Sequence, residues 1–197
     1  MARRVFFSFH YQNDVSRAWI VRNSWVTQER EDAGFYDSSA FERFQRTGDD
    51  ALKQFLNREL DNSSVTCVLA GAHTAWRRWV RYEIFRSVVR GNGLFGVKIH
   101  SIPNLQKQVD NQGDNPFSLL GFELINGYVR FKEHNGQQWV WSPDFPRGIA
   151  QSDIKTDLKG GTNSTLDSYF GLVDWNSDSG YQNLGSWVEI VAKKAGR

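Results

Sequence analysis

Short apolar runs alternate with helical patterns along the first half of the chain. The segment Arg4–Phe9 is apolar at consecutive positions, which is typical of a strand covered on both faces in a parallel sheet. From Asp14 to Val26 the apolar residues recur at i, i+3 and i+4, so this stretch is predicted to be an amphipathic helix capped by Asn13 or Asp14.

The same alternation continues to about residue 100. Further strands are predicted at residues 34–36, 64–70 and 94–99, and further helices at residues 48–60 and 75–89. This order indicates an α/β fold, a parallel sheet with helices on both faces. Ligands of such sheets bind beyond the carboxyl ends of the strands, so the loops 8–13, 37–39 and 71–74 should share one rim.

The pattern changes in the second half. The turn dipeptides Asn126-Gly127 and Asn135-Gly136 separate strand-like runs, which predicts a β-meander between Gly121 and Trp141. A final helix is predicted at residues 181–194. The length of 197 residues suits one domain, with a core of about residues 1–100 and elaborations over about 101–197.

Charge and composition narrow the function classes. The 24 basic and 22 acidic residues give a net charge of +2, too little to indicate a nucleic-acid partner. No apolar stretch approaches the roughly 18 residues of a membrane span. The single cysteine, Cys67, lies in an apolar run and is expected to pack in the core. We therefore expect a cytoplasmic protein.

Glu83 is the main candidate for a functional carboxylate. On a helical wheel with Trp76 as origin, Glu83 falls in the apolar sector together with Val80, Ile84 and Ser87, while the residues expected outside it are Arg78, Arg81 and Tyr82. One interpretation is that only the aliphatic part of the Glu83 side chain packs against the core, while its carboxylate reaches solvent or pairs with an arginine such as Arg86. The other is a desolvated functional carboxylate near the ligand-binding rim, and we favour it because of that position.

The residues around Glu83 resemble a known family. Trp79-Val80-Arg81-Tyr82-Glu83 is similar to the W-C-x-x-E motif of TIR domains, with Val80 in place of the cysteine. A closer resemblance is to the TIR-like proteins of the bacterial Thoeris antiphage system, and it is carried by the segments 4–11, 21–27, 64–69 and 77–84, with further familiar residues at 115–117, 174–175, 180–181 and 186–188. The loop 37–47 departs from the usual plant and animal TIR pattern.

This resemblance implies a flavodoxin-like, TIR-like fold and an activity. The enzyme would cleave NAD⁺, release nicotinamide and make a cyclic ADP-ribose isomer that activates an NAD-depleting effector through a diffusible signal upon phage infection. Glu83 would be the catalytic carboxylate. Candidate substrate-binding residues are Ser8, Phe9, His10, Tyr11, Asp37, Ser38, Trp76 and Trp79. Core packing is the alternative role for the aromatic residues, and turn or cap chemistry for the polar ones.

No cofactor or metal is expected, since NAD⁺ is the substrate. The four histidines, His10, His73, His100 and His134, stand far apart and lack zinc-ligand spacing. A phage-derived trigger and self-assembly are the expected partners besides NAD⁺, and no nucleic acid or membrane is expected. Two other functions remain open at this point: a non-catalytic TIR-like adaptor, and a receptor that binds a nucleotide without turning it over.

Overall fold

The computed structural model describes residues 3–26, 33–34, 44, 46–158 and 164–197. Five parallel strands form the first sheet, in the order β2-β1-β3-β4-β10. Their bounds are β1 Val5–Ser8, β2 Ala33–Gly34, β3 Val65–Ala70, β4 Gly93–Lys98 and β10 Leu172–Asp174. This is the flavodoxin-like strand order, so the predicted fold class is confirmed.

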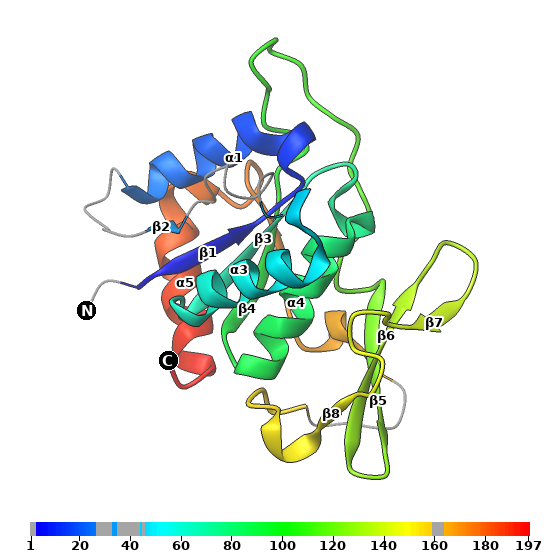
Figure 1. Ribbon diagram of the computed structural model, residues 1–197. Coiled ribbons are helices and arrows are strands. Elements are labelled where there is room, and N and C mark those ends of the chain that lie inside the picture. Colours follow the sequence, from blue (N-terminus) through cyan, green and yellow to red (C-terminus); the bar gives the residue numbers. More distant parts are fainter. Residues whose placement is uncertain (1–2, 27–32, 35–43, 45, 159–163) are drawn as a thin grey trace.

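Helices cover both faces of this sheet (Figure 1). Helices α1 (Tyr11–Val26) and α5 (Gly180–Lys194) pack together over one face, and α3 (Asp49–Asp61) and α4 (Arg78–Arg90) over the other. The apolar spacing of α3 explains its place, because Leu52, Leu56 and Leu60 are fully buried on one side of it. Within the described residues, no helix combines the length and apolarity needed to cross a bilayer.

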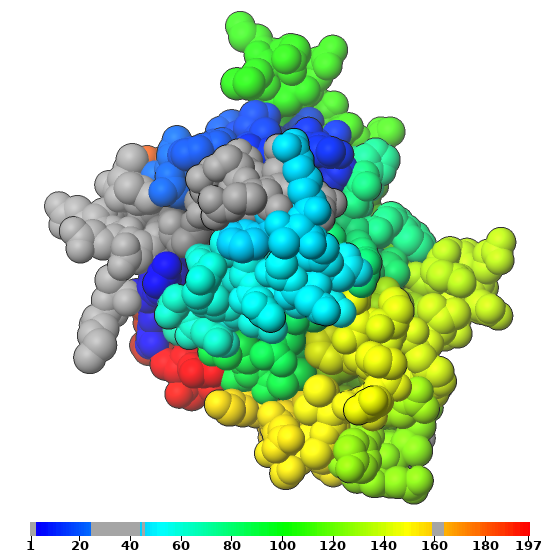
Figure 2. Space-filling model, in the orientation of Figure 1, coloured from blue at the N-terminus to red at the C-terminus, as the bar shows by residue number. Residues whose placement is uncertain are grey.

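The predicted β-meander is confirmed, but it forms a sheet of its own and does not extend the parallel sheet. The order of this second sheet is β7-β6-β5-β9, with β8 also pairing with β6. The strands are antiparallel and comprise β5 Leu120–Ile125, β6 Tyr128–His134, β7 Trp139–Trp141, β8 Ile149–Ala150 and β9 Ser164–Thr165. In the space-filling view, the β6–β7 hairpin projects from the body of the molecule (Figure 2).

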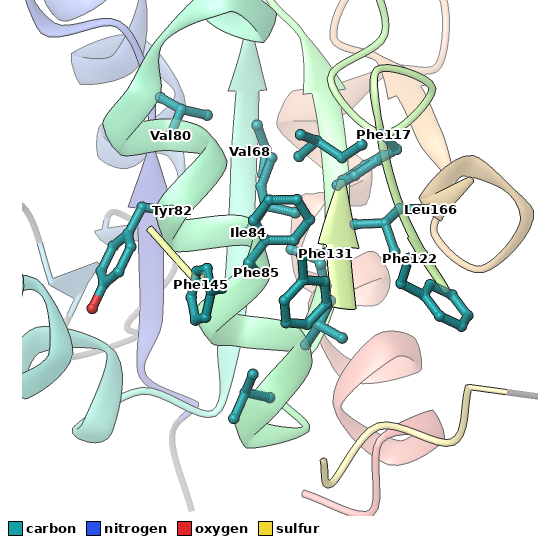
Figure 3. Close-up of a cluster of buried hydrophobic side chains, with 14 of the residues drawn as sticks. Val68, Val80, Tyr82, Ile84, Phe85, Phe117, Phe122, Phe131, Phe145 and Leu166 are labelled. Atoms are coloured by element: carbon teal, nitrogen blue, oxygen red, sulfur yellow. The ribbon is translucent and has the colours of Figure 1, made fainter. Parts of the chain in front are cut away.

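Helix α4 is packed between the two sheets. Its Phe85 ring lies 4.5 Å from the Phe131 ring of β6 and 5.8 Å from that of Phe145, while Ile84 points toward Val68 of β3 (Figure 3). Stacked and edge-on ring pairs of this kind add to the free energy gained by burying apolar area. The helix that carries Glu83 is therefore held from both sides.

One local prediction is wrong, and one strand was not predicted. Helix α1 begins at Tyr11 and is not capped by Asn13 or Asp14, because the backbone N–H groups of those two residues already donate to the carbonyl of His10. The Asp14 side chain is instead buried against Arg17 and Thr74. The short strand β10 was not predicted, and it and α5 complete the first sheet and its helical layer from beyond residue 100.

A long connection from His100 to Leu119 crosses the carboxyl end of the first sheet, at the top of Figure 1. At Gly113 it passes so close to the loop after β3 that a Cβ atom would lie 2.3 Å from the carbonyl oxygen of Gly71. Only glycine permits this approach, because real Cβ atoms do not come that near to backbone atoms.

Replacing Gly113 with alanine is expected to lower the free energy of unfolding by about 1–3 kcal/mol, the usual cost of overpacking. The matched control is Gly171→Ala, since a Cβ there meets nothing within 4 Å. Chemical denaturation of the two variants and the parent measures both values. Equal, small changes in the two variants would show that the long connection does not pack closely on this loop.

Candidate active site

The start of helix α4 differs from the prediction. The sequence favoured one helix from Ala75, but Thr74–Trp76 form the 3₁₀ helix η1 and the α-helix begins only at Arg78. Between them Arg77 is extended, with φ −87° and ψ 120°. Thr74 therefore does not cap α4; its hydroxyl accepts a hydrogen bond from the backbone N–H of Gly71. Trp76 precedes α4 and is not part of its apolar stripe.

The wheel also misplaced two side chains. Arg81 and Tyr82 were expected outside the packed sector, yet they are 7% and 4% exposed. Both residues are buried by parts of the chain distant in sequence. The second sheet covers Arg81, and Tyr82 packs against Phe145 and donates a hydrogen bond to Asn57 of α3. A wheel assumes one buried side, whereas α4 is buried on several. Arg78 is exposed, as predicted.

Glu83 lies inside this helix and is 3% exposed. Ser8, at the carboxyl end of β1, donates its hydroxyl to the Glu83 carboxylate at 2.5 Å. That distance falls in the range of charge-assisted hydroxyl–carboxylate bonds. One turn further along α4, Ser87 donates to the Glu83 carbonyl at 2.7 Å and lies 2.8 Å from the Thr66 hydroxyl of β3. The Ser8 bond holds the carboxylate at the carboxyl edge of the sheet, the Ser87 bonds tie this turn of α4 to β3, and the 3% exposure of Glu83 rules out the interpretation with a solvated tip.

His10 follows β1 at the same rim. Partial burial is the main cause that lowers the pKa of this imidazole from 6.5 to about 4, with further lowering from the charge of Arg77 and from His73. Its Nδ1 atom is buried and has no hydrogen-bond partner among the residues that the structure describes. At neutral pH the ring is therefore uncharged.

Two of the three loops predicted to share a rim do so. The Asp14 carboxylate accepts a hydrogen bond from Thr74 at 3.3 Å and packs against Gly71, where a Cβ would be 2.3 Å from an Asp14 oxygen. The first turn of α1, which follows the loop after β1, and the loop after β3 are thus in direct contact. The third loop, with the candidates Asp37 and Ser38, lies outside the described residues.

The aromatic candidates fall into three places. Phe9 and Tyr11 pack with the core cluster under α1 and α5, on the face of the sheet away from α4. Trp79 is partly buried against the core beside Tyr82, with the Arg78 guanidinium over its ring. Trp76 is 41% exposed at the rim, and its indole N–H donates to Asp114 at 2.8 Å. Of the four, Trp76 has the most open ring.

In the described part of the chain, no group of three or more His, Cys, Asp or Glu side chains is placed to hold a metal ion. Cys67 is fully buried in the core, as predicted, and burial raises the pKa of its thiol well above the usual value. A thiol in that environment is a poor nucleophile.

The neutral state of His10 has a consequence for stability. Between pH 6.5 and about 4 the unfolded chain binds a proton that the folded imidazole does not, so stability due to this residue is lost as pH falls through that window. We expect His10→Gln to lose less stability than the parent between pH 6.5 and 4.5, measured by urea unfolding. A His10 imidazole that titrates near 6.5 in an NMR experiment would contradict this expectation.

Residues 6–104 match the family model described as "Thoeris protein ThsB, TIR-like domain". A protein of Bacillus cereus (strain MSX-D12), named "Putative cyclic ADP-D-ribose synthase ThsB1", is 39% identical over 192 residues, which cover 95% of this chain and 100% of that protein. The chain belongs to the Thoeris ThsB family.

The family assignment places the site in context. The ThsB match begins in β1, ends in the long connection after β4, and so includes Ser8, His10 and Glu83. The similarity to the Bacillus cereus protein spans nearly the whole chain and so takes in most of the second sheet as well. The predicted resemblance to Thoeris TIR-like proteins is confirmed.

Proposed function

We propose that this ThsB-family protein cleaves NAD⁺ at the bond between nicotinamide and ribose and joins the remainder into a cyclic ADP-ribose isomer. The observation that carries the proposal is the Glu83 carboxylate, which is 3% exposed and held by Ser8 at the carboxyl edge of a flavodoxin-like sheet. Ligands of such sheets bind at this edge. The name of the Bacillus cereus relative, a cyclic ADP-D-ribose synthase, supports the same product class.

A single carboxylate suffices for this reaction. Ordinary glycosides need a second carboxyl group to protonate the leaving oxygen. Nicotinamide leaves from a cationic pyridinium as a neutral molecule, so no acid is required, and the main task is to stabilise an oxocarbenium-like ribose. A fixed anion in a water-poor site does this as preorganised charge, and the Ser8 hydroxyl keeps Glu83 oriented.

The fate of the ribose cation decides the product. Attack by water on the anomeric carbon gives ADP-ribose. Attack by a hydroxyl of the same molecule, held close at a high effective concentration, forms the new C–O bond, releases a proton and closes a ring. We assign Trp76 to the wall that stacks on an aromatic ring of NAD⁺, because its ring is open at the rim. His10, kept neutral, adds no positive charge beside the cation.

The partners follow from the proposal. NAD⁺ is the substrate and no separate cofactor takes part. In a Thoeris system the cyclic product would be a diffusible signal in the cytoplasm, and an NAD-depleting effector would respond to it after a phage-derived trigger has activated this protein, with self-assembly as a further mode of activation.

The direct test incubates the purified protein with NAD⁺ and follows nicotinamide by chromatography and the second product by mass spectrometry. A product lighter than ADP-ribose by one water identifies the cyclic compound. The assay is run with and without lysate of phage-infected cells that lack the gene. ADP-ribose as the sole product would replace the cyclase by a hydrolase. Saturable NAD⁺ binding without any product under both conditions would favour a nucleotide receptor.

A further inference from the structure

A buried arginine joins the active-site helix to the second sheet. Arg81 lies two residues before Glu83 on α4 and is 7% exposed. Its Nε donates to the carbonyl of Ala75 in η1 at 2.8 Å, and its Nη1 donates to a carboxylate oxygen of Glu133 at 3.1 Å. One side chain therefore binds the turn at the rim and a strand of the other sheet at once.

Glu133 is itself held in place. It lies on β6 and is 9% exposed, and its second oxygen accepts a hydrogen bond from Ser142 at 2.5 Å. Ser142 follows β7, and its backbone N–H donates to Phe131 of β6 at 2.9 Å. The carboxylate thus bonds to Arg81 through one oxygen and to Ser142, at the end of its own hairpin, through the other, and these two bonds fix its orientation.

Trp76 lies where these parts meet. The Arg81 guanidinium lies 5.1 Å from the centre of its ring, within the range of a cation–π contact. The indole N–H donates to Asp114 of the long connection, and the ring lies near the turn of the β6–β7 hairpin, since a Cβ atom added at Gly136 would be 3.9 Å from it. A residue 41% exposed at the rim is thereby oriented by groups from α4 and from the long connection, beside the turn of the β6–β7 hairpin.

We propose that Arg81 and Glu133 are positioning residues that set the place of Trp76 against the substrate, so that the second sheet takes part in substrate binding without touching NAD⁺. The proposal rests on the proposed NAD⁺ site. Glu83 is oriented from the other side of α4 by Ser8, so the pair acts on the wall of the site and not on the carboxylate. Both charges are buried, so the loss of one partner leaves the other charge without compensation in the protein interior.

A matched pair of variants separates positioning from plain stability. Glu133→Gln weakens the bond to Arg81. Glu123→Gln weakens a second ion pair of the same sheet, in which Lys132 lies 3.0 Å from Glu123 on the opposite face from Glu133. Both are made in a Glu83→Gln background to stop turnover, and the Kd for NAD⁺ is measured by calorimetry. We expect Glu133→Gln to raise the Kd about tenfold, as for the loss of one charged hydrogen bond, and Glu123→Gln to leave it within twofold.

The position of the Trp76 ring can also be followed by NMR, without any binding measurement. In protein labelled with 5-fluorotryptophan, the Trp76 resonance is assigned by its loss in Trp76→Phe. Glu133→Gln should shift or broaden this resonance, and Glu123→Gln should not. In a Trp76→Ala background Glu133→Gln should have no further effect on the Kd, because the two changes act through the same wall.

The outcomes are distinct. An unchanged Trp76 resonance in Glu133→Gln, or equal effects of the two glutamine variants, overturns the positioning role while leaving the proposed function in place. Failure of every variant and of the parent to bind NAD⁺ overturns the proposed function instead, and with it the part of the proposal that concerns the substrate.

Discussion

Replacing Glu83 with glutamine is expected to lower kcat for nicotinamide release by about 10²–10³-fold, the usual cost of removing one preorganised electrostatic group from an active site. Glutamine has the shape of glutamate and can still accept the Ser8 hydroxyl, so the helix should stay folded. The Kd for NAD⁺ should change far less than kcat, because the negative charge acts mainly on the cationic transition state.

The control for this change is Glu59→Gln, a carboxylate of similar size on the neighbouring helix α3. It should leave kcat within twofold of the parent. Thermal melting of both variants checks that they are folded. If folded Glu83→Gln retains most of the activity, Glu83 is a structural residue and the reaction depends on another group.

Replacing Arg17 with methionine is expected to cost about 3–5 kcal/mol of unfolding free energy, as for other buried pairs that lose one charge. Arg17 is 2% exposed and lies 3.3 Å from the fully buried Asp14 carboxylate. It also donates to the carbonyls of Ile102 at 2.8 Å and Gln108 at 3.3 Å, which tie the long connection to α1. Methionine fills a similar volume but leaves Asp14 and these carbonyls with fewer partners.

The pH dependence gives this prediction a second readout. Desolvation raises the pKa of Asp14 above 3.8, so the folded state binds the proton more tightly and gains stability relative to the unfolded chain as pH falls through that raised pKa. Without Arg17 the pKa should rise further. The stability lost in Arg17→Met should therefore be largest at neutral pH and become smaller as pH is lowered toward the raised pKa of Asp14.

The matched control is Arg3→Met, which breaks the more exposed pair of Arg3 and Glu189 at 3.1 Å. Pairs of this kind contribute less than about 1 kcal/mol. Urea unfolding at several pH values measures all three proteins. A loss below about 1 kcal/mol in Arg17→Met, equal to that of the control, would show that the buried network contributes little to stability.

The parts of the fold that could be predicted are those specified by local sequence. Strand β3 and helix α3 have strong apolar patterns, and their observed bounds agree with the predicted ones within one residue. The placement of both Ser8 and Glu83 near the carboxyl edge of the sheet also followed from the direction of the parallel strands, but the hydrogen bond between them was not predicted.

The rest depends on partners distant in sequence. Strand β10 is three residues long and is fixed by pairing with β4, from which it is separated by the whole second sheet. The burial of Arg81 depends on Glu133, and a helical wheel cannot show that a second sheet covers the far side of α4. The break at Arg77 likewise has no proline or glycine to mark it. The burial of Arg81 against Glu133 is also the feature that carries the positioning proposal.

The most direct test of the central claim is mass spectrometry of extracts from phage-infected cells that carry either the parent gene or Glu83→Gln. We predict a compound lighter than ADP-ribose by one water in cells with the parent protein, and none in cells with the variant at equal protein abundance. The same compound at the same level in cells that carry a stably folded Glu83→Gln would contradict the account.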